Sequence, residues 1–77
     1  MLVRILLHST LKELVGNSSG KVAIDCPEET TAVDLLKILG ISYRGVGFLV
    51  AENKLLNPYD RLPVNKEISI YPIIGGG

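Results

Sequence analysis

The sequence predicts an α+β fold, and three observations carry this prediction. Apolar and polar residues alternate in short stretches near the start, near residue 24 and near the end of the chain, which is typical of half-buried strands. One stretch near the middle has the three- and four-residue spacing of an amphipathic helix. The chain has 77 residues, 47% of them hydrophobic and 21% charged, which suits the core of one small domain.

The order of the expected elements restricts the possible folds. We expect the first hairpin to consist of a strand at residues 2–8, a short helical turn at 10–15 and a second strand at 21–26. The main helix is expected at residues 31–39. It is followed by a third strand at 47–52, a short return strand at 55–56 and a final strand at 66–71. Thr31 and Asp34 resemble a capping box at the start of the main helix, and Gly40 suits its left-handed end. A hairpin and a crossover helix, with the final strand returning to the middle beside the first, form the β-grasp fold. We expect a mixed sheet of about four or five strands over residues 1–74, with one main helix and a short second helix.

Composition and charge argue against several classes of function. Eight Lys and Arg residues balance eight Asp and Glu residues, and the basic residues are scattered, so the basic patch that nucleic-acid binding needs is missing. The longest apolar stretches are too short to span a bilayer, and no secretory signal follows Met1. Cys26 is the single cysteine, which permits neither an internal disulfide nor a zinc cluster built on cysteine pairs. We expect a cytoplasmic protein without nucleic-acid, membrane or metal partners.

The usual catalytic groups are also missing from the sequence. No phosphate-binding loop is present, and Gly45 and Gly47 lack the third glycine and the following helix of a dinucleotide site. His8 has no carboxylate or serine at the spacing of a catalytic triad, so we interpret it as an ordinary residue at a strand end. Cys26 has the inward parity of its strand and no basic neighbour closer than Lys21, which favours a buried thiol over a reactive one.

The C-terminal residues are the exception. Three glycines end the printed sequence, Gly75, Gly76 and Gly77. They lose much backbone entropy on ordering and bury no side chain, so we expect residues 75–77 to form a mobile tail. Strand residues run into these glycines without a polar spacer, and the start of the tail is set by Pro72, Ile73 and Ile74. Residues without side chains can thread a narrow cleft where any Cβ would clash, although a frayed chain end would show the same pattern.

Strand parity predicts a surface on which a partner could dock. If the inward residues of the strands face the main helix, then Leu6, Tyr71 and either Phe48 or Leu49 lie on the open face of the sheet. Several large apolar side chains on a solvent-facing sheet indicate an interaction patch, for which we take Leu6, Phe48 and Tyr71. The alternative is that one strand is out of register in this interpretation.

Over its full length the sequence resembles the ubiquitin-like sulfur carriers. This family contains the small subunit of molybdopterin synthase (MoaD) and the carrier of thiamine biosynthesis (ThiS). Residues 3–7 and 11–16 are similar to its first strand and its Leu-Arg-Glu-Leu-x-Gly helix, and residues 31–36 to its Thr-Val-x-Asp-Leu-Leu segment. Residues 71–77, Tyr-Pro-Ile-Ile-Gly-Gly-Gly, resemble its aromatic-Pro-Pro-x-x-Gly-Gly ending. The length and the Tyr-Pro pair favour the molybdopterin branch.

Two positions depart from the family pattern. The family has an acidic Asp-Gly-Asp-Glu turn before the last strand, where this chain has Val-Asn-Lys-Glu at residues 64–67. Asn65 can still adopt the left-handed turn conformation, but both aspartates are gone, which bears on the identity of the partner. Ile73 replaces the second proline of the ending, which loosens the extended shape that proline would impose.

The resemblance implies that the Gly77 carboxylate is the reactive group. A ubiquitin-activating-type adenylyltransferase, similar to MoeB or ThiF, would use ATP to convert this carboxylate to an acyl adenylate, and sulfur from a persulfide donor would then give a thiocarboxylate. Gly75 and Gly76 would thread the clefts of this enzyme and of a synthase large subunit similar to MoaE, which passes the sulfur to a pterin precursor. The carrier would bind no cofactor and catalyse nothing alone.

Other functions share parts of this pattern and stay open. The same thiocarboxylate chemistry would serve thiamine synthesis or tRNA thiolation. A ubiquitin-like protein modifier would join the activated Gly77 to lysine amines of its targets. A β-grasp module that only binds a partner would carry the glycines incidentally.

Overall fold

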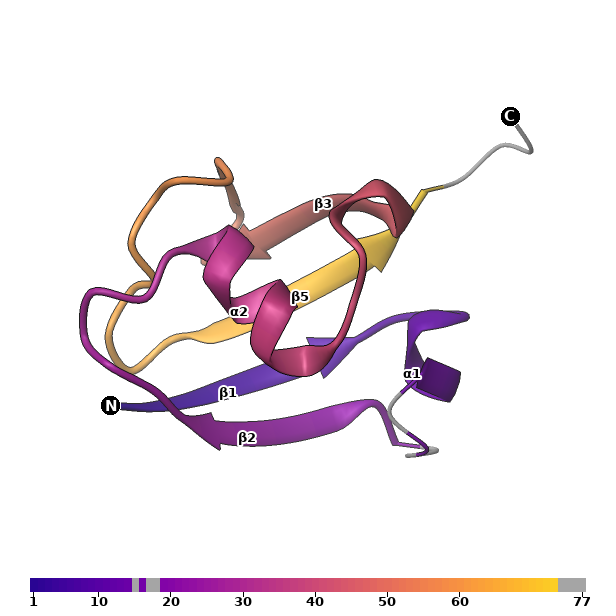
Figure 1. Cartoon of the computed structure of the whole chain (residues 1–77), viewed down its shortest axis with the longest axis horizontal. Helices are drawn as coiled ribbons and strands as arrows, with labels where there is room; N and C mark the ends of the chain where they lie inside the picture. The colour runs from indigo at the N-terminus through magenta and orange to yellow at the C-terminus, as the bar shows by residue number, and fades with distance from the viewer. Residues whose placement is uncertain (15, 17–18, 74–77) are drawn as a thin grey trace.

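The structure is a computed structural model, and it describes residues 1–14, 16 and 19–73. Figure 1 shows a sheet crossed on one face by the main helix, with the C-terminal strand in its middle. The elements in chain order are β1 (Leu2–Leu7), α1 (Leu11–Leu14), β2 (Lys21–Asp25), α2 (Ala32–Leu39), a 3-10 turn (Tyr43–Gly45), β3 (Val46–Ala51), β4 (Lys54–Leu56) and β5 (Glu67–Pro72).

The sheet has five strands in the order β2-β1-β5-β3-β4. β5 pairs parallel with β1 and antiparallel with β3, while β2 and β4 pair antiparallel with β1 and β3 at the two edges. The first and last strands therefore lie side by side in the centre, and α2 connects β2 to β3 across them. This arrangement confirms the predicted β-grasp fold.

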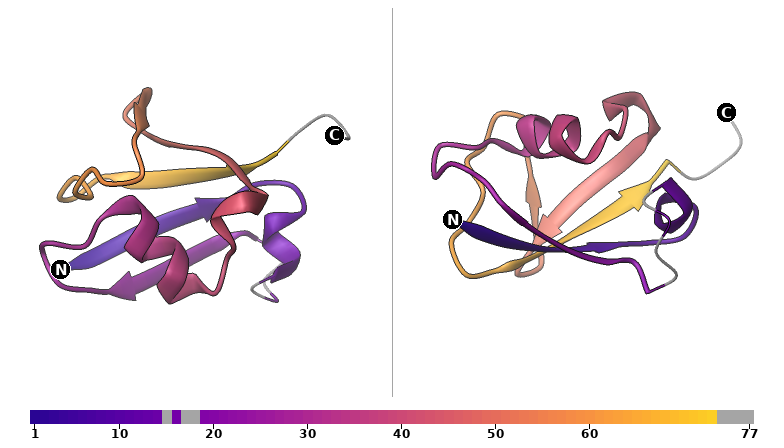
Figure 2. Two further views of the ribbon diagram at one scale, coloured as in Figure 1. Left: turned by 45° about the horizontal axis from the view of Figure 1, so that its top comes forward. Right: turned by 60° about the horizontal axis from the view of Figure 1, so that its bottom comes forward.

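The hydrophobic core lies between α2 and one face of the sheet. Successive strand residues point to opposite faces, so the inward set of β1 is Val3, Ile5 and Leu7, all buried. Ile68 and Ile70 of β5 are fully buried beside them, and α2 contributes Ala32, Leu35 and Leu36. Figure 2 shows α2 on this face, whereas the opposite face carries no helix from the described part of the chain.

The main helix begins and ends as the sequence predicts. The Asp34 backbone N–H donates to Thr31 Oγ1 at 3.3 Å, and the Thr31 N–H donates to Asp34 Oδ2 at 3.2 Å, which completes a capping box. Gly40 ends the helix with a φ of 74°, a left-handed conformation that glycine adopts without steric cost. The backbone N–H groups of Ala32 and Val33 donate to the Asp60 and Pro58 carbonyls, which ties the start of α2 to the turn of residues 57–60 that follows β4.

Some element boundaries differ from the prediction. β3 starts at Val46 and ends at Ala51, because Glu52 and Asn53 have positive φ and form the turn into β4. Part of the expected connection at residues 41–46 is a 3-10 turn, stabilised by a hydrogen bond from the Arg44 N–H to Ser42 Oγ. Asn65 has a φ of 59°, as expected for a left-handed turn residue.

No helix in the described ranges is long and apolar enough to cross a membrane. Cys26 is buried, as its parity predicts.

Candidate functional site

The candidate site begins where β5 passes into the C-terminal residues. Pro72 pairs with Val46 of β3, and the Ile73 N–H donates to the Gly45 carbonyl at 3.2 Å. These contacts hold the last described residue against the start of β3, at one end of the sheet (Figure 1). The predicted tail residues Ile74, Gly75, Gly76 and Gly77 lie outside the described residues.

Gly47 allows the close approach of β3 to this strand end. The register between β3 and β5 shifts between Val46 and Phe48, so Gly47 is the extra residue of a bulge. A Cβ on Gly47 would lie 2.7 Å from the Pro72 carbonyl oxygen, which is closer than real Cβ contacts. Glycine is therefore needed here for space, and the bulge sets the position of Pro72 and Ile73.

A stack of three aromatic rings stands beside the same strand end. Tyr71 lies between His8 and Phe48, with ring centroids 4.0 Å from His8 and 4.6 Å from Phe48. The rings are nearly parallel, at 8° and 22°, and they come from the ends of β1, β5 and β3. Burial of aromatic faces on one another fixes these three chain segments relative to the start of the tail.

The structure places all three predicted docking residues on the open sheet face. The bulge at Gly47 turns Phe48 outward, where it is 41% exposed, and leaves Leu49 buried. The strand register places Leu6, Ser69, Val50 and Leu55 in one row across this face, next to the ring stack. We call the six nonpolar or aromatic residues of this region the ring patch: Leu6, His8, Phe48, Val50, Leu55 and Tyr71.

Sequence reasoning missed His8 as a member of the ring patch. The Nε2 atom of His8 is buried and has no hydrogen-bond partner among the described residues. A buried imidazole nitrogen without a partner is costly, and the stacking of the ring on Tyr71 is a favourable contact that offsets part of this cost. Parity was the available signal, because His8 follows Leu6 by two residues and therefore shares its side of the strand.

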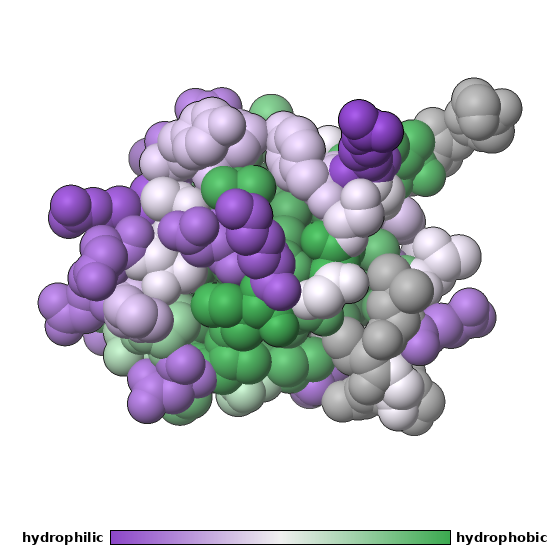
Figure 3. All heavy atoms as spheres, viewed as in Figure 1, coloured by the Kyte–Doolittle hydropathy of each residue, from purple (hydrophilic) through white to green (hydrophobic). Residues whose placement is uncertain are grey.

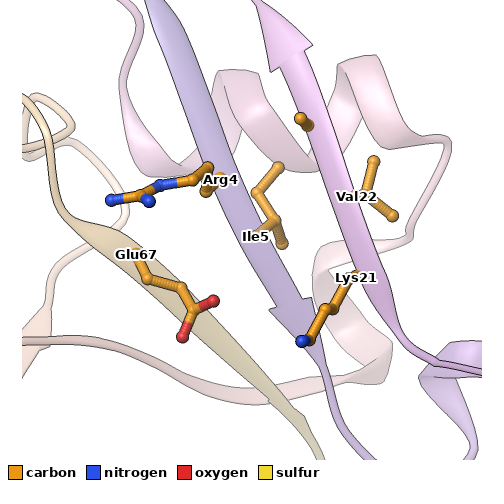
Figure 4. A pocket seen from close by; sticks show the side chains of 6 residues that line it. Arg4, Ile5, Lys21, Val22 and Glu67 are labelled. Carbon is orange, nitrogen blue, oxygen red and sulfur yellow. The ribbon is translucent and has the colours of Figure 1, made fainter.

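Charged side chains occupy the other end of the open face. Arg4, Lys21 and Glu67 line a shallow pocket of about 250 Å³ together with Ile5, Val22 and Ala23. Figure 4 shows Arg4 extending from β1 toward β5, which carries Glu67. Arg4 and Glu67 therefore form a charged end of the open face away from the tail, whereas Lys21 lies directly opposite Leu6 of the ring patch.

The described residues include no group of three or more His, Cys, Asp or Glu side chains that could hold a metal ion.

Comparison with known proteins identifies the fold. No family model matches the chain, and no curated protein matches its sequence. The crystal structure of SAMP1 from Haloferax volcanii superposes with a TM-score of 0.75 at 18% identity, over 100% of both chains. A second structure, of H. volcanii small archaeal modifier protein 1, gives a TM-score of 0.75 at 16% identity over 95% of this chain and 98% of that one. The chain thus has the ubiquitin-like β-grasp fold.

Proposed function

We propose that this protein is a sulfur carrier whose C-terminal Gly77 is adenylated and then thiocarboxylated, and that it donates this sulfur in molybdopterin synthesis. The observation that supports the proposal is the junction between β5 and the tail. Pro72 and Ile73 are held on β3, and the sequence continues from there as Ile-Gly-Gly-Gly. The four residues beyond Ile73 can reach about 13 Å when extended, which suits entry into a cleft of a partner enzyme.

The proposed chemistry has three steps, of which the first activates the Gly77 carboxyl group and the other two install the sulfur. A carboxylate oxygen attacks the α-phosphorus of ATP, pyrophosphate leaves, and an acyl adenylate forms. The terminal sulfur of a persulfide, RSS⁻, then attacks the acyl carbon and AMP leaves, which gives an acyl disulfide. A thiolate then attacks the sulfur atom that is bonded to R. The S–S bond breaks, which releases the thiocarboxylate and leaves a mixed disulfide between the thiol and R. ATP, the persulfide and the thiol come from partners, so this chain supplies the acyl group and its position.

Docking by the ring patch would deliver the tail to those partners. The patch lies at the sheet end from which Ile73 emerges, so a protein bound there is also next to the tail. Aromatic side chains are the commonest anchors of protein interfaces, because they bury much area at low entropic cost. We propose that Leu6, Phe48 and Tyr71 contact first an adenylyltransferase similar to MoeB or ThiF, and then a synthase large subunit similar to MoaE.

A protein modifier is the second candidate function. The structural likeness to small archaeal modifier protein 1 favours it, since that protein has the same fold along nearly the same length. In this case the activated Gly77 carbonyl would form an isopeptide bond with a lysine amine of a target and release AMP or a thiol. Sulfur transfer to a thiazole or to tRNA shares the thiocarboxylate step and differs only in the final acceptor.

One reaction separates these functions. The protein is incubated with ATP, its adenylyltransferase and a persulfide donor, in the presence and absence of a lysate from which it has been depleted. The sulfur-carrier proposal predicts replacement of one oxygen by sulfur in the intact mass, and pterin dithiolene formation after the synthase large subunit is added. A ladder of lysine-linked conjugates without sulfur transfer would instead establish a modifier. An unchanged mass with an active enzyme would contradict both.

A further inference from the structure

β2 forms one edge of the sheet, with no strand of the described chain beyond it (Figure 1). The Leu7 N–H donates to the Gly20 carbonyl and the Cys26 N–H donates to the Met1 carbonyl. Because bonding pairs alternate in an antiparallel ladder, Val22 and Ile24 direct their backbone groups toward β1. Lys21, Ala23 and Asp25 therefore direct theirs outward, where a further strand could accept and donate hydrogen bonds.

We propose that a second copy of this chain is that further strand, and that two copies form a symmetric dimer through antiparallel pairing of β2. The two-fold axis passes between Ala23 of one protomer and Ala23 of its partner. In this register, residues whose backbone groups point outward stand opposite residues of the same kind in the partner strand. The two Ala23 residues can therefore exchange a pair of N–H···O=C hydrogen bonds across the axis. The Lys21 N–H already donates to Ser19 Oγ, so we count about four hydrogen bonds, from Ala23 and Asp25 of each copy.

The charges on β2 fit this register and no shifted one. With Ala23 on the axis, Lys21 of each protomer stands directly opposite Asp25 of its partner, and the two pairs are identical by symmetry. Opposite charges at directly opposed positions stabilise a strand pair. The Asp25 side chain is 82% exposed, and its Oδ1 accepts from the Met1 amino group at 2.9 Å, so its second oxygen can face the partner.

The α2 side of the edge is also self-complementary. Val22 and Ile24 are only half buried, and each would lie opposite the other residue of the partner strand. Figure 3 shows hydrophobic side chains reaching the surface over the region between α2 and β2. Pairing of two such edges would cover these side chains and join the two cores along one continuous sheet.

The other edge of the sheet lacks these properties. β4 has only three residues, and the positive φ values of Glu52 and Asn53 immediately before it end any longer ladder. A symmetric pair centred on Leu55 would place Lys54 opposite Leu56, which gives no charge pairing. β2 is also separated from β5 by β1, so the proposed dimer leaves the ring patch and the strand end uncovered.

Two charge variants test the register directly. Lys21→Glu places Glu opposite Asp25, and Asp25→Lys places Lys opposite Lys21, so each alone should weaken the dimer at least tenfold in sedimentation equilibrium. An equimolar mixture of the two variants restores both opposite-charge pairs and should form heterodimers with nearly wild-type affinity. The double variant Lys21→Glu/Asp25→Lys should also dimerise, which controls for the loss of the Met1 contact. Circular dichroism melts verify that each variant is folded.

A backbone variant tests the strand pairing without changing any charge. Ala23→Pro removes an outward N–H and leaves the bonds to β1 in place, so a folded monomer is expected. A wild-type protein that stays monomeric to millimolar concentration would overturn the proposal. A dimer insensitive to the charge variants, or unchanged by Ala23→Pro, would overturn it as well. The proposal does not rest on the sulfur-carrier function, because deletion of residues 75–77 should leave the dimer intact.

Discussion

At the scale of single residues, Gly47 is the position near the tail where an added methyl group should lower stability most. Gly47→Ala forces a Cβ against the Pro72 carbonyl, so we expect a loss of about 1–3 kcal/mol in unfolding free energy. Gly45→Ala is the matched control, because a Cβ there meets nothing within 4 Å. Urea titration measures both, and equal stability of the two variants would contradict the proposed role of the bulge.

Phe48 carries a second prediction at this scale. Phe48 is 41% exposed and its ring stacks on Tyr71, so Phe48→Ser should lower the unfolding free energy by about 1 kcal/mol and leave the protein folded. It should also lower the rate of thiocarboxylation at subsaturating enzyme about tenfold. Val64→Ser is the control, since Val64 is another exposed apolar residue and lies before the opposite end of β5. Rates are followed by intact mass, and similar rates for both variants would argue against docking by the ring patch.

The ring patch also shows what parity can and cannot predict. Alternation was sufficient to place Leu6 and Tyr71 on the open face, because β1 and β5 are regular there. It left Phe48 and Leu49 as alternatives, since a one-residue bulge reverses the parity of all residues on one side of it. The bulge depends on contact between Gly47 and Pro72, which are 25 positions apart, so no local pattern predicts it.

At the scale of elements, the capping box of α2 should contribute measurably to stability. Thr31→Ala removes the acceptor of the Asp34 N–H, and loss of such an N-cap costs about 1 kcal/mol. Thr31→Ser keeps the acceptor and should stay close to wild type. Thermal unfolding compares the three proteins, and equal melting temperatures for the Ala and Ser variants would contradict the predicted contribution.

Asp34 makes the stability of this helix depend on pH. The hydrogen bond from the Thr31 backbone, followed by that with its side chain, lowers the pKa of Asp34 below its ordinary value of 3.8. The charged form is therefore favoured by folding, and its contribution is present above pH 3.8 and disappears as the pH falls through the lowered folded value. Relative to Asp34→Asn, the wild type should be more stable at neutral pH, and the difference should vanish in acid. A difference that is constant with pH would contradict this cause.

At the scale of the whole molecule, the order of the elements made the fold predictable. Two hairpins, one capped helix and a final apolar strand leave few ways to bury one face of a sheet, and the sequence marks each of these elements. The 3-10 turn and the exact end of β3 were not predictable, because a short turn has no periodicity of its own. The proposed dimer could not be predicted from the sequence either. The charges of β2 are seen to be self-complementary only when the register with β1 shows which residues direct their backbone groups outward.

Shortening the tail should abolish the reaction of the chain end without affecting the stability of the fold. Deletion of Gly76 and Gly77 removes no side chain and no residue of the sheet, so the melting temperature should stay at the wild-type value. Thiocarboxylation should be abolished. Unfolding of the shortened protein would show that the glycines belong to the folded domain and would contradict the proposed division at residues 74 and 75.

The most direct measurement is tandem mass spectrometry of the C-terminal peptide after incubation with ATP, the adenylyltransferase and the persulfide donor. We predict a single replacement of oxygen by sulfur, located on Gly77 and absent when ATP is omitted. Sulfur found on Cys26 instead, or a Gly77 that remains an unmodified carboxylate beside an enzyme active on another carrier, would contradict the sulfur-carrier function.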